Sequence, residues 1–270
     1  MKAYLKLIGI LLLPLAFVIW YANSPVQIPP PGWKLSKMQT FTPSPSPSKG
    51  RDIEKEIEKE EDKSDLPIDS IEREVGREAP LDSSSHRILF FGDSMVEGLM
   101  RRMNGYAYAN GHSVTNVVWY SSTTEIWART DTLRYFINKV KPTFAMISIG
   151  GNEQFVKDPD SREPCIRQIL KVLGDIPLVW IGVPAWKEDS GINDLTQRVV
   201  GKNRYFDSRG LTLLRGRDHM HPTFAAASDW MDSVAVWMSS PETAHPIRMN
   251  KPTNEEKHTY STYALQPLKR

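Results

Sequence analysis

Four polar side chains, carried by three well-separated segments, could together perform acyl transfer. Ser94 follows a Gly-Asp pair, and its hydroxyl could act as a nucleophile. Asn152 follows a Gly-Gly pair, and its side-chain amide is a neutral donor that suits a developing oxyanion. Asp218 and His221 stand three residues apart, which lets a carboxylate fix the tautomer of an imidazole base. Residues of these types could serve as a nucleophile, a base and a carboxylate that orients the base.

Each segment also has a plainer interpretation. Ser94 could merely cap the helix that follows it, and the glycine pair before Asn152 could be an ordinary turn. The segment 218–222 could be a polar turn that leads into a helix. His219 competes with His221 as the base, although the three-residue spacing favours His221. The order and placement of the segments along the chain decide between these interpretations.

The surrounding sequence predicts the elements that would position these side chains. Short apolar-rich runs, typical of buried parallel strands, occur at 88–91, 114–119, 144–149, 178–183 and 205–206. Between them, apolar residues recur at helical spacing, as in 133–140 and 166–173. This alternation predicts a three-layer α/β/α domain over 86–240 with a five-stranded parallel sheet. The site of such a domain lies at the carboxyl ends of the strands.

Over residues 86–240 the three segments, in their order and placement, resemble the SGNH (GDSL-like) hydrolase family. The matching motifs are Gly92-Asp93-Ser94, Gly150-Gly151-Asn152 and the segment 218–221. The resemblance implies a flavodoxin-like fold, with Ser94 as nucleophile, His221 as general base and Asp218 as the residue that orients it. It also implies that the Ser94 N–H and the Asn152 amide are oxyanion donors.

Two positions depart from the family's pattern. The family places a glycine after the second strand as a further oxyanion donor, whereas this sequence reads Trp-Tyr-Ser-Ser-Thr-Thr over 119–124. A backbone N–H of Ser121 or Ser122 is expected to serve instead, and Ser122 is taken as the donor. Glu153 stands where the family often has aspartate, which is expected to change contacts around the site rather than its chemistry.

Composition limits the other classes of function. The formal net charge is +2, and no segment has the basic excess that nucleic-acid binding requires. The single cysteine excludes an internal disulfide framework and a cysteine-rich zinc site. His219 and His221 have no further His or Cys cluster with which to complete a metal site. We therefore expect no cofactor, no metal and no nucleic-acid partner.

The sequence on either side of the domain predicts an anchor, a spacer and a tail. Residues 7–22 are uncharged, follow two lysines and end near a Trp-Tyr pair, so we expect one transmembrane helix within 1–23. A cleaved signal peptide is the alternative, but no good cleavage site follows the run. Residues 24–85 are rich in proline and charge and predict a solvated linker. Residues 241–270 lack a periodic apolar face and predict a polar tail.

Three tryptophans have two interpretations. Trp127, Trp180 and Trp186 could form a sugar-stacking wall near the strand ends. Packing in the core is the alternative, and it is favoured for Trp180.

The sequence and the resemblance together predict a membrane-anchored serine esterase or O-acyltransferase. The expected substrates are acyl esters, with acetyl as the expected group, of envelope or secreted glycans; lipid esters and small aryl esters are the alternatives. The catalytic domain would then lie on the periplasmic or extracellular side of a single-pass anchor. The alternative is a catalytically silent binding module on the same fold that partners a membrane acyltransferase, and the altered segment 119–124 motivates it.

Overall fold

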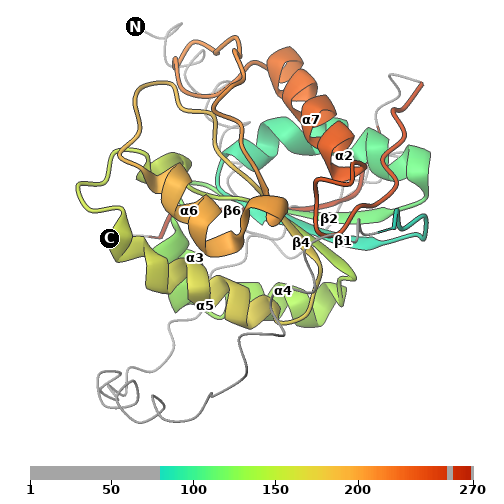
Figure 1. The fold of residues 1–270 in the computed structure, drawn as a ribbon, viewed down its shortest axis with the longest axis horizontal. Coiled ribbons are helices and arrows are strands. Elements are labelled where there is room, and N and C mark those ends of the chain that lie inside the picture. Colours follow the sequence, from blue (N-terminus) through green and yellow to red (C-terminus); the bar gives the residue numbers. More distant parts are fainter. Residues whose placement is uncertain (1–79, 254–257, 269–270) are drawn as a thin grey trace, which may run out of the picture. The chain divides into compact units, whose positions relative to one another are not determined.

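The structure, a computed structural model, describes residues 80–253 and 258–268. Within them, six parallel strands form one sheet in the order β5-β4-β3-β1-β2-β6 (Figure 1). The strands are β1 (Arg87–Gly92), β2 (Ser113–Trp119), β3 (Phe144–Ser148), β4 (Leu178–Ile181), β5 (Tyr205–Phe206) and β6 (Ser261–Leu265). The α-helices are α2 (Met95–Asn110), α3 (Thr124–Arg129), α4 (Thr132–Val140), α5 (Glu163–Leu173), α6 (Ile192–Val200) and α7 (Phe224–Met238).

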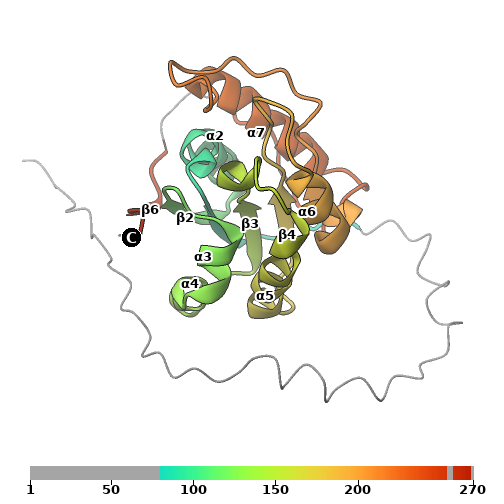
Figure 2. The ribbon, with the colours of Figure 1, turned by 90° about the vertical axis from the view of Figure 1, so that its left-hand side faces the viewer.

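Helices cover both faces of the sheet, as the alternating pattern predicts. Figure 2 shows α2 and α7 on one face and α3, α4 and α5 on the other. Along β1, Ile88 and Phe90 pack into the core under α2 and α7, whereas Leu89 and Phe91 pack into the opposite core. A strand points successive side chains to opposite faces, so a strand between two helix layers is apolar throughout. The predicted α/β class with a parallel sheet is confirmed.

The expectation of five strands is wrong, because a sixth strand comes from the segment predicted to be a polar tail. β6 pairs in parallel with β2, with Thr115 opposite Ser261 and Trp119 opposite Leu265. It lies at the edge of the sheet, and of its five residues only Leu265 is buried. An edge strand needs few apolar residues, so this one carries little of the pattern by which the other strands are recognised.

Other residues after α7 also belong to the domain. Ile247 and Met249 are buried in the core formed with α2 and α7. The Ile247 N–H donates to the Met238 carbonyl at 3.0 Å, and Asp82 forms a bridge with Ile247. The segment after α7 therefore packs against the core on the face of the sheet that α2 and α7 cover.

The predicted transmembrane helix within 1–23 lies outside the described residues, as does the predicted linker apart from 80–85. Across residues 80–253 and 258–268, no helix has both the length and the apolar character needed to cross a membrane.

Candidate active site

Ser94 stands at the junction of β1 and α2, at the carboxyl edge of the sheet. The strand ends at Gly92, where a Cβ atom would lie 1.8 Å from the Ser148 carbonyl oxygen of β3, so only glycine allows this approach. The Asp93 N–H donates to the same oxygen at 3.0 Å. Ser94 comes next and makes no side-chain capping bond to α2. Its hydroxyl is therefore not used as a helix cap.

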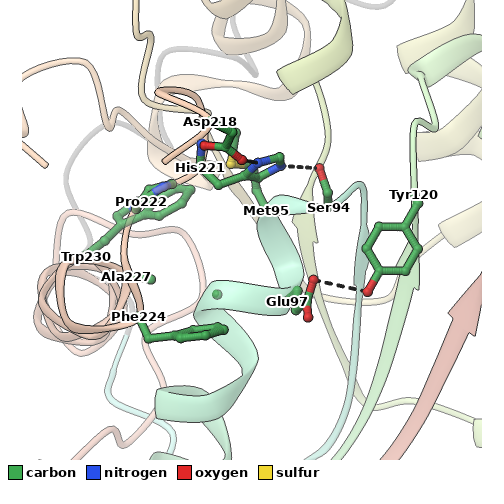
Figure 3. A pocket seen from close by; sticks show the side chains of 11 residues that line it. Ser94, Met95, Glu97, Tyr120, Asp218, His221, Pro222, Phe224, Ala227 and Trp230 are labelled. Carbon is green, nitrogen blue, oxygen red and sulfur yellow. Dashed lines mark hydrogen bonds and ion pairs between the residues drawn. The ribbon is translucent and has the colours of Figure 1, made fainter. Parts of the chain in front are cut away.

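The hydroxyl instead meets the imidazole of His221. Ser94 Oγ lies 2.8 Å from His221 Nε2, and His221 Nδ1 lies 2.7 Å from Asp218 Oδ2 (Figure 3). The N–H groups of Met220 and His221 both donate to Asp218 Oδ1 at 3.0 Å. The structure thus brings together the three side chains that the sequence nominates, although they come from two segments more than a hundred residues apart.

The Asp218 carboxylate is strongly held in its ionised form. Its hydrogen bond with His221, followed by the two backbone donors, keeps its pKa well below the usual range. Such a carboxylate stays charged beside the imidazole and favours the tautomer that carries its proton on Nδ1. The unprotonated Nε2 then faces Ser94 and can accept its proton. His219 has a left-handed backbone (φ 59°), and among the described residues its side chain makes no hydrogen bond or ion pair. The geometry thus favours His221 over His219.

The loop after β3 is tied to the nucleophile loop through Asp93. Asp93 is fully buried and accepts hydrogen bonds from the N–H groups of Met95 (2.9 Å), Gly150 (3.2 Å) and Gly151 (2.9 Å). Burial raises the pKa of Asp93 to about 6 despite these donors. A single carboxylate therefore fixes the segment that carries Asn152 against the start of α2.

Asn152 and Ser122 do meet, but not as two oxyanion donors. Asn152 Nδ2 donates to the Ser122 carbonyl at 2.9 Å, which leaves the second amide hydrogen unused by this bond. The Ser122 N–H donates to the Trp119 carbonyl at 3.1 Å, and Ser122 is fully buried. Ser122 is therefore wrong as a donor, because its N–H closes a turn.

Ser121 is the alternative donor from this loop, and its geometry differs from that of Ser122. It is exposed, and its φ of 57° lies in the left-handed region, which a non-glycine residue seldom adopts. No hydrogen bond of its N–H is formed within the part of the chain that the structure describes. The N–H of Ser121 is thus free where that of Ser122 is not.

Glu153 lies behind the site and orders its neighbours. It is fully buried and accepts from the Thr124 N–H and hydroxyl, both at 2.8 Å. Arg162 Nε lies 2.9 Å from its Oε1. Burial raises its pKa, which these hydrogen bonds and the guanidinium oppose. Glu153 thereby fixes the start of α3, and among the described residues no hydrogen bond or ion pair joins it to Ser94 or His221.

A cavity of about 270 Å³ opens beside Ser94, between the first turns of α2 and α7 (Figure 3). Its lining is mostly apolar and aromatic, with a few polar groups, as is usual for small-molecule sites. It comprises Ser94, Met95, Glu97, Gly98, Tyr120, Asp218, His221, Pro222, Phe224, Ala227 and Trp230. The sequence analysis did not identify Glu97, Gly98, Tyr120 and Phe224 as lining residues. Of these four, only Glu97 could have been found from its position, because it follows Ser94 by about one helical turn.

The three tryptophans do not form a wall. Trp127 and Trp180 are buried in the core beneath α3 to α6. Trp186 is partly exposed and packs edge-on against Phe155, with ring centroids 5.5 Å apart. Packing in the core is therefore the role of the first two, and only Trp186 is left near the surface.

No group of three or more His, Cys, Asp or Glu residues that could hold a metal ion occurs in the described ranges. The candidate site brings together a hydrogen-bonded serine, histidine and aspartate, the amide of Asn152 and a cavity beside the serine.

Comparison with known proteins finds likeness only at the level of structure. No family model and no curated protein sequence matches the chain. A crystal structure of TesA aligns with a TM-score of 0.46 at 14% identity, over 56% of this chain and 97% of that one. BT4096, described as a gut microbial diltiazem-metabolizing enzyme, aligns with a TM-score of 0.41 at 15% identity, over 57% of this chain and 47% of that one. At such low similarity, the chemistry of the site rests on its own geometry.

Proposed function

We propose that the chain is an SGNH-type serine esterase or O-acyltransferase. The observation that supports this most directly is the pair of short contacts that join Ser94 to His221 and His221 to Asp218, at 2.8 and 2.7 Å. An acyl-transfer enzyme needs a nucleophile and base within hydrogen-bond reach, and a third group that orients the base.

The reaction proceeds through a serine ester. His221 takes the proton from Ser94 as Oγ attacks the ester carbonyl, and Asp218 stabilises the imidazolium that forms. The Ser94 N–H at the start of α2, the Ser121 N–H and the second amide hydrogen of Asn152 stabilise the oxyanion. His221 then protonates the leaving alcohol. Water or an acceptor hydroxyl, deprotonated by the same histidine, releases the acyl group.

The proposed substrates are acyl esters, with acetyl as the expected group, of envelope or secreted glycans. A membrane anchor within 1–23 and the spacer over 24–85 would hold the domain near the envelope and raise its local concentration there. The near-neutral charge of the chain agrees with an uncharged ester rather than a polyanionic ligand. The domain would lie on the periplasmic or extracellular side.

The alternative is a silent binding module that partners a membrane acyltransferase. The observation that favours it is the buried, turn-bonded N–H of Ser122, because it leaves Ser121, a strained non-glycine residue, as the donor from this loop. The two functions differ in whether Ser94 is reactive.

A serine-directed fluorophosphonate probe separates them. We expect the folded wild type to be labelled at Ser94, and Ser94→Ala to show no labelling, because the attacking oxygen is gone. Circular dichroism of both proteins controls for folding. Absence of labelling on a folded wild type would exclude the enzyme and leave the binding module.

Separate substitutions of the two histidines test the base. His221→Ala is expected to slow labelling and ester hydrolysis by about a thousandfold or more, because the proton acceptor is lost. His219→Ala should change the rates by less than about threefold. The assignment of the base is wrong if His219→Ala causes the larger loss.

A further inference from the structure

We infer that the cavity beside Ser94 holds the alcohol part of the ester, and that Glu97 binds its hydroxyl groups. The inference rests on the proposed function and deepens it, since it assigns one side of the site to the sugar. Glu97 takes no part in the proposed steps of the reaction.

The position of His221 decides which half of the ester enters the cavity. The alcohol oxygen must receive its proton from His221, so the alcohol lies on the histidine side of Ser94. His221 and Asp218 both line the cavity. Asn152 and Ser121, whose N–H groups face the oxyanion in the proposed reaction, are not among its lining residues. The cavity is therefore on the leaving-group side.

Glu97 brings an incompletely used carboxylate into this cavity. It is partly buried in the first turn of α2, and its Oε2 accepts a hydrogen bond from the Tyr120 hydroxyl at 3.0 Å (Figure 3). Burial and the nearby carboxylate raise the pKa of Tyr120, which keeps that hydroxyl a donor. No basic side chain pairs with Glu97 among residues 80–253 and 258–268. An ionised carboxylate accepts about four hydrogen bonds, so Glu97 retains capacity for donors on a ligand.

The surroundings favour hydroxyl donors over a cationic ligand. The guanidinium carbon of Arg101 lies 3.5 Å from the ring centroid of Phe224, which lines the cavity. This places a positive charge at the rim, four residues after Glu97, and disfavours an ammonium group there. The cavity presents aromatic side chains beside the Glu97 carboxylate, so it fits a ligand that combines an apolar ring face with several hydroxyl groups. A sugar has both of these features.

Two small residues give the cavity its width. Gly98 faces Ala227, and a Cβ atom at Gly98 would lie only 3.0 Å from the Ala227 Cβ. A larger side chain at residue 98 would project into the space between α2 and α7. Gly98 therefore sets the size of the alcohol that fits, while Glu97 sets its polarity.

A matched pair of acetyl esters tests the inference. One is an O-acetylated methyl glucoside and the other is cyclohexylmethyl acetate, which has a six-membered ring but no hydroxyl groups. We expect the wild type to prefer the glucoside ester. Glu97→Gln should lower kcat/KM for that ester by about ten- to hundredfold, since a hydrogen bond to a charged group is lost, and change the other ester by less than about twofold.

Further variants serve as controls. Glu163→Gln makes the same change in the first turn of α5, away from the cavity, and should affect neither ester. Gly98→Val should lower kcat/KM for both esters, because it fills the cavity. Fluorophosphonate labelling of Glu97→Gln shows whether Ser94 is still reactive in the variant, so that loss of sugar binding is separated from loss of the nucleophile.

Several outcomes would overturn the inference. They are equal activity of the labelled wild type on the two esters, an equal loss on both in Glu97→Gln, or no loss on either. If the folded wild type is not labelled, the proposed function fails by itself. In that case, weaker binding of the O-acetylated methyl glucoside by Glu97→Gln, measured by calorimetry, would still support the cavity's role, and no binding by the wild type would contradict it.

Discussion

At the scale of single residues, Asp93 shows how a group outside the reaction can fix the geometry of a site. Its carboxylate accepts the N–H groups of Gly150 and Gly151, which lead to Asn152, and that of Met95, which follows Ser94. Nucleophile and amide donor are therefore held by one buried anion. Burial of this anion costs free energy, and the pKa of Asp93 is raised as a consequence.

This cost gives the folded protein a predictable response to pH. Because the pKa of Asp93 is about 6 in the folded protein and 3.8 is the ordinary value for an aspartate, its stabilising contribution is complete below about pH 4 and is lost as pH rises through about 6. The loss amounts to about 3 kcal/mol. Asp93→Asn removes this titration, so the advantage of the wild type over the variant should be larger at about pH 4 than at about pH 7. Urea unfolding of both proteins at the two pH values measures it.

The same variant has a second expected effect. Both carboxylate oxygens of Asp93 accept backbone N–H bonds, whereas an asparagine has one oxygen, and its NH₂ group would face a backbone donor. The loops that carry Ser94 and Asn152 would then be held less firmly, so Asp93→Asn should also slow fluorophosphonate labelling. If the advantage of the wild type instead grows with pH, the backbone donors outweigh burial, and the direction of the pKa shift is wrong.

The residue scale also separates what the sequence could and could not predict about the site. Asp218 and His221 are predictable because their contact is local, and Ser94 and Asn152 because each follows a strand whose apolar run is easily recognised. Glu97 acquires its place only through the packing of α2 against β2 and α7, which no spacing in the sequence reveals. The folded structure also determines which of the adjacent residues Ser121 and Ser122 has a free backbone N–H, and the sequence does not reveal this.

At the scale of elements, the edge strand β6 supports the loop that carries Ser121. The Tyr120 N–H donates to the Leu265 carbonyl at 3.0 Å, and Trp119 Nε1 donates to the Gln266 carbonyl at 2.9 Å. Hydrogen bonds to β6 and to the residue that follows it thus fix the start of the loop after β2. The sequence pattern could not predict this strand, because its stability depends on a neighbour's edge rather than on two apolar faces.

Leu265 is the side chain that fixes β6 to the core. It is 1% exposed, so Leu265→Ala should lower the free energy of unfolding by about 2–5 kcal/mol. Leu268→Ala is the matched control, since Leu268 is 43% exposed and should change stability by less than about 0.5 kcal/mol. Chemical denaturation measures both. Similar values for the two variants would mean that β6 does not contribute to the folded domain.

At the scale of the whole molecule, the proposed glycan substrate and the proposed anchor are linked. The domain has no strongly basic excess that would bring it to a charged surface, with a net charge of +2 over the whole chain. The proposed residence at the envelope would then depend on the uncharged run 7–22. If that run were removed by a signal peptidase, the esterase would have to find its polymer by diffusion.

We therefore predict that residues 7–22 stay attached to the domain and hold it in the membrane. Mass spectrometry of the membrane fraction after alkaline extraction should detect peptides from this run in the same polypeptide as Ser94. Leu15→Arg places a charge at the centre of the run, which costs about 2.5–3.5 kcal/mol on insertion, and should move the protein to the soluble fraction. Fluorophosphonate labelling of Ser94 should persist there, because the charge lies outside the domain. A soluble wild type that lacks the run would instead establish a cleaved signal, and the enzyme would act as a diffusing esterase.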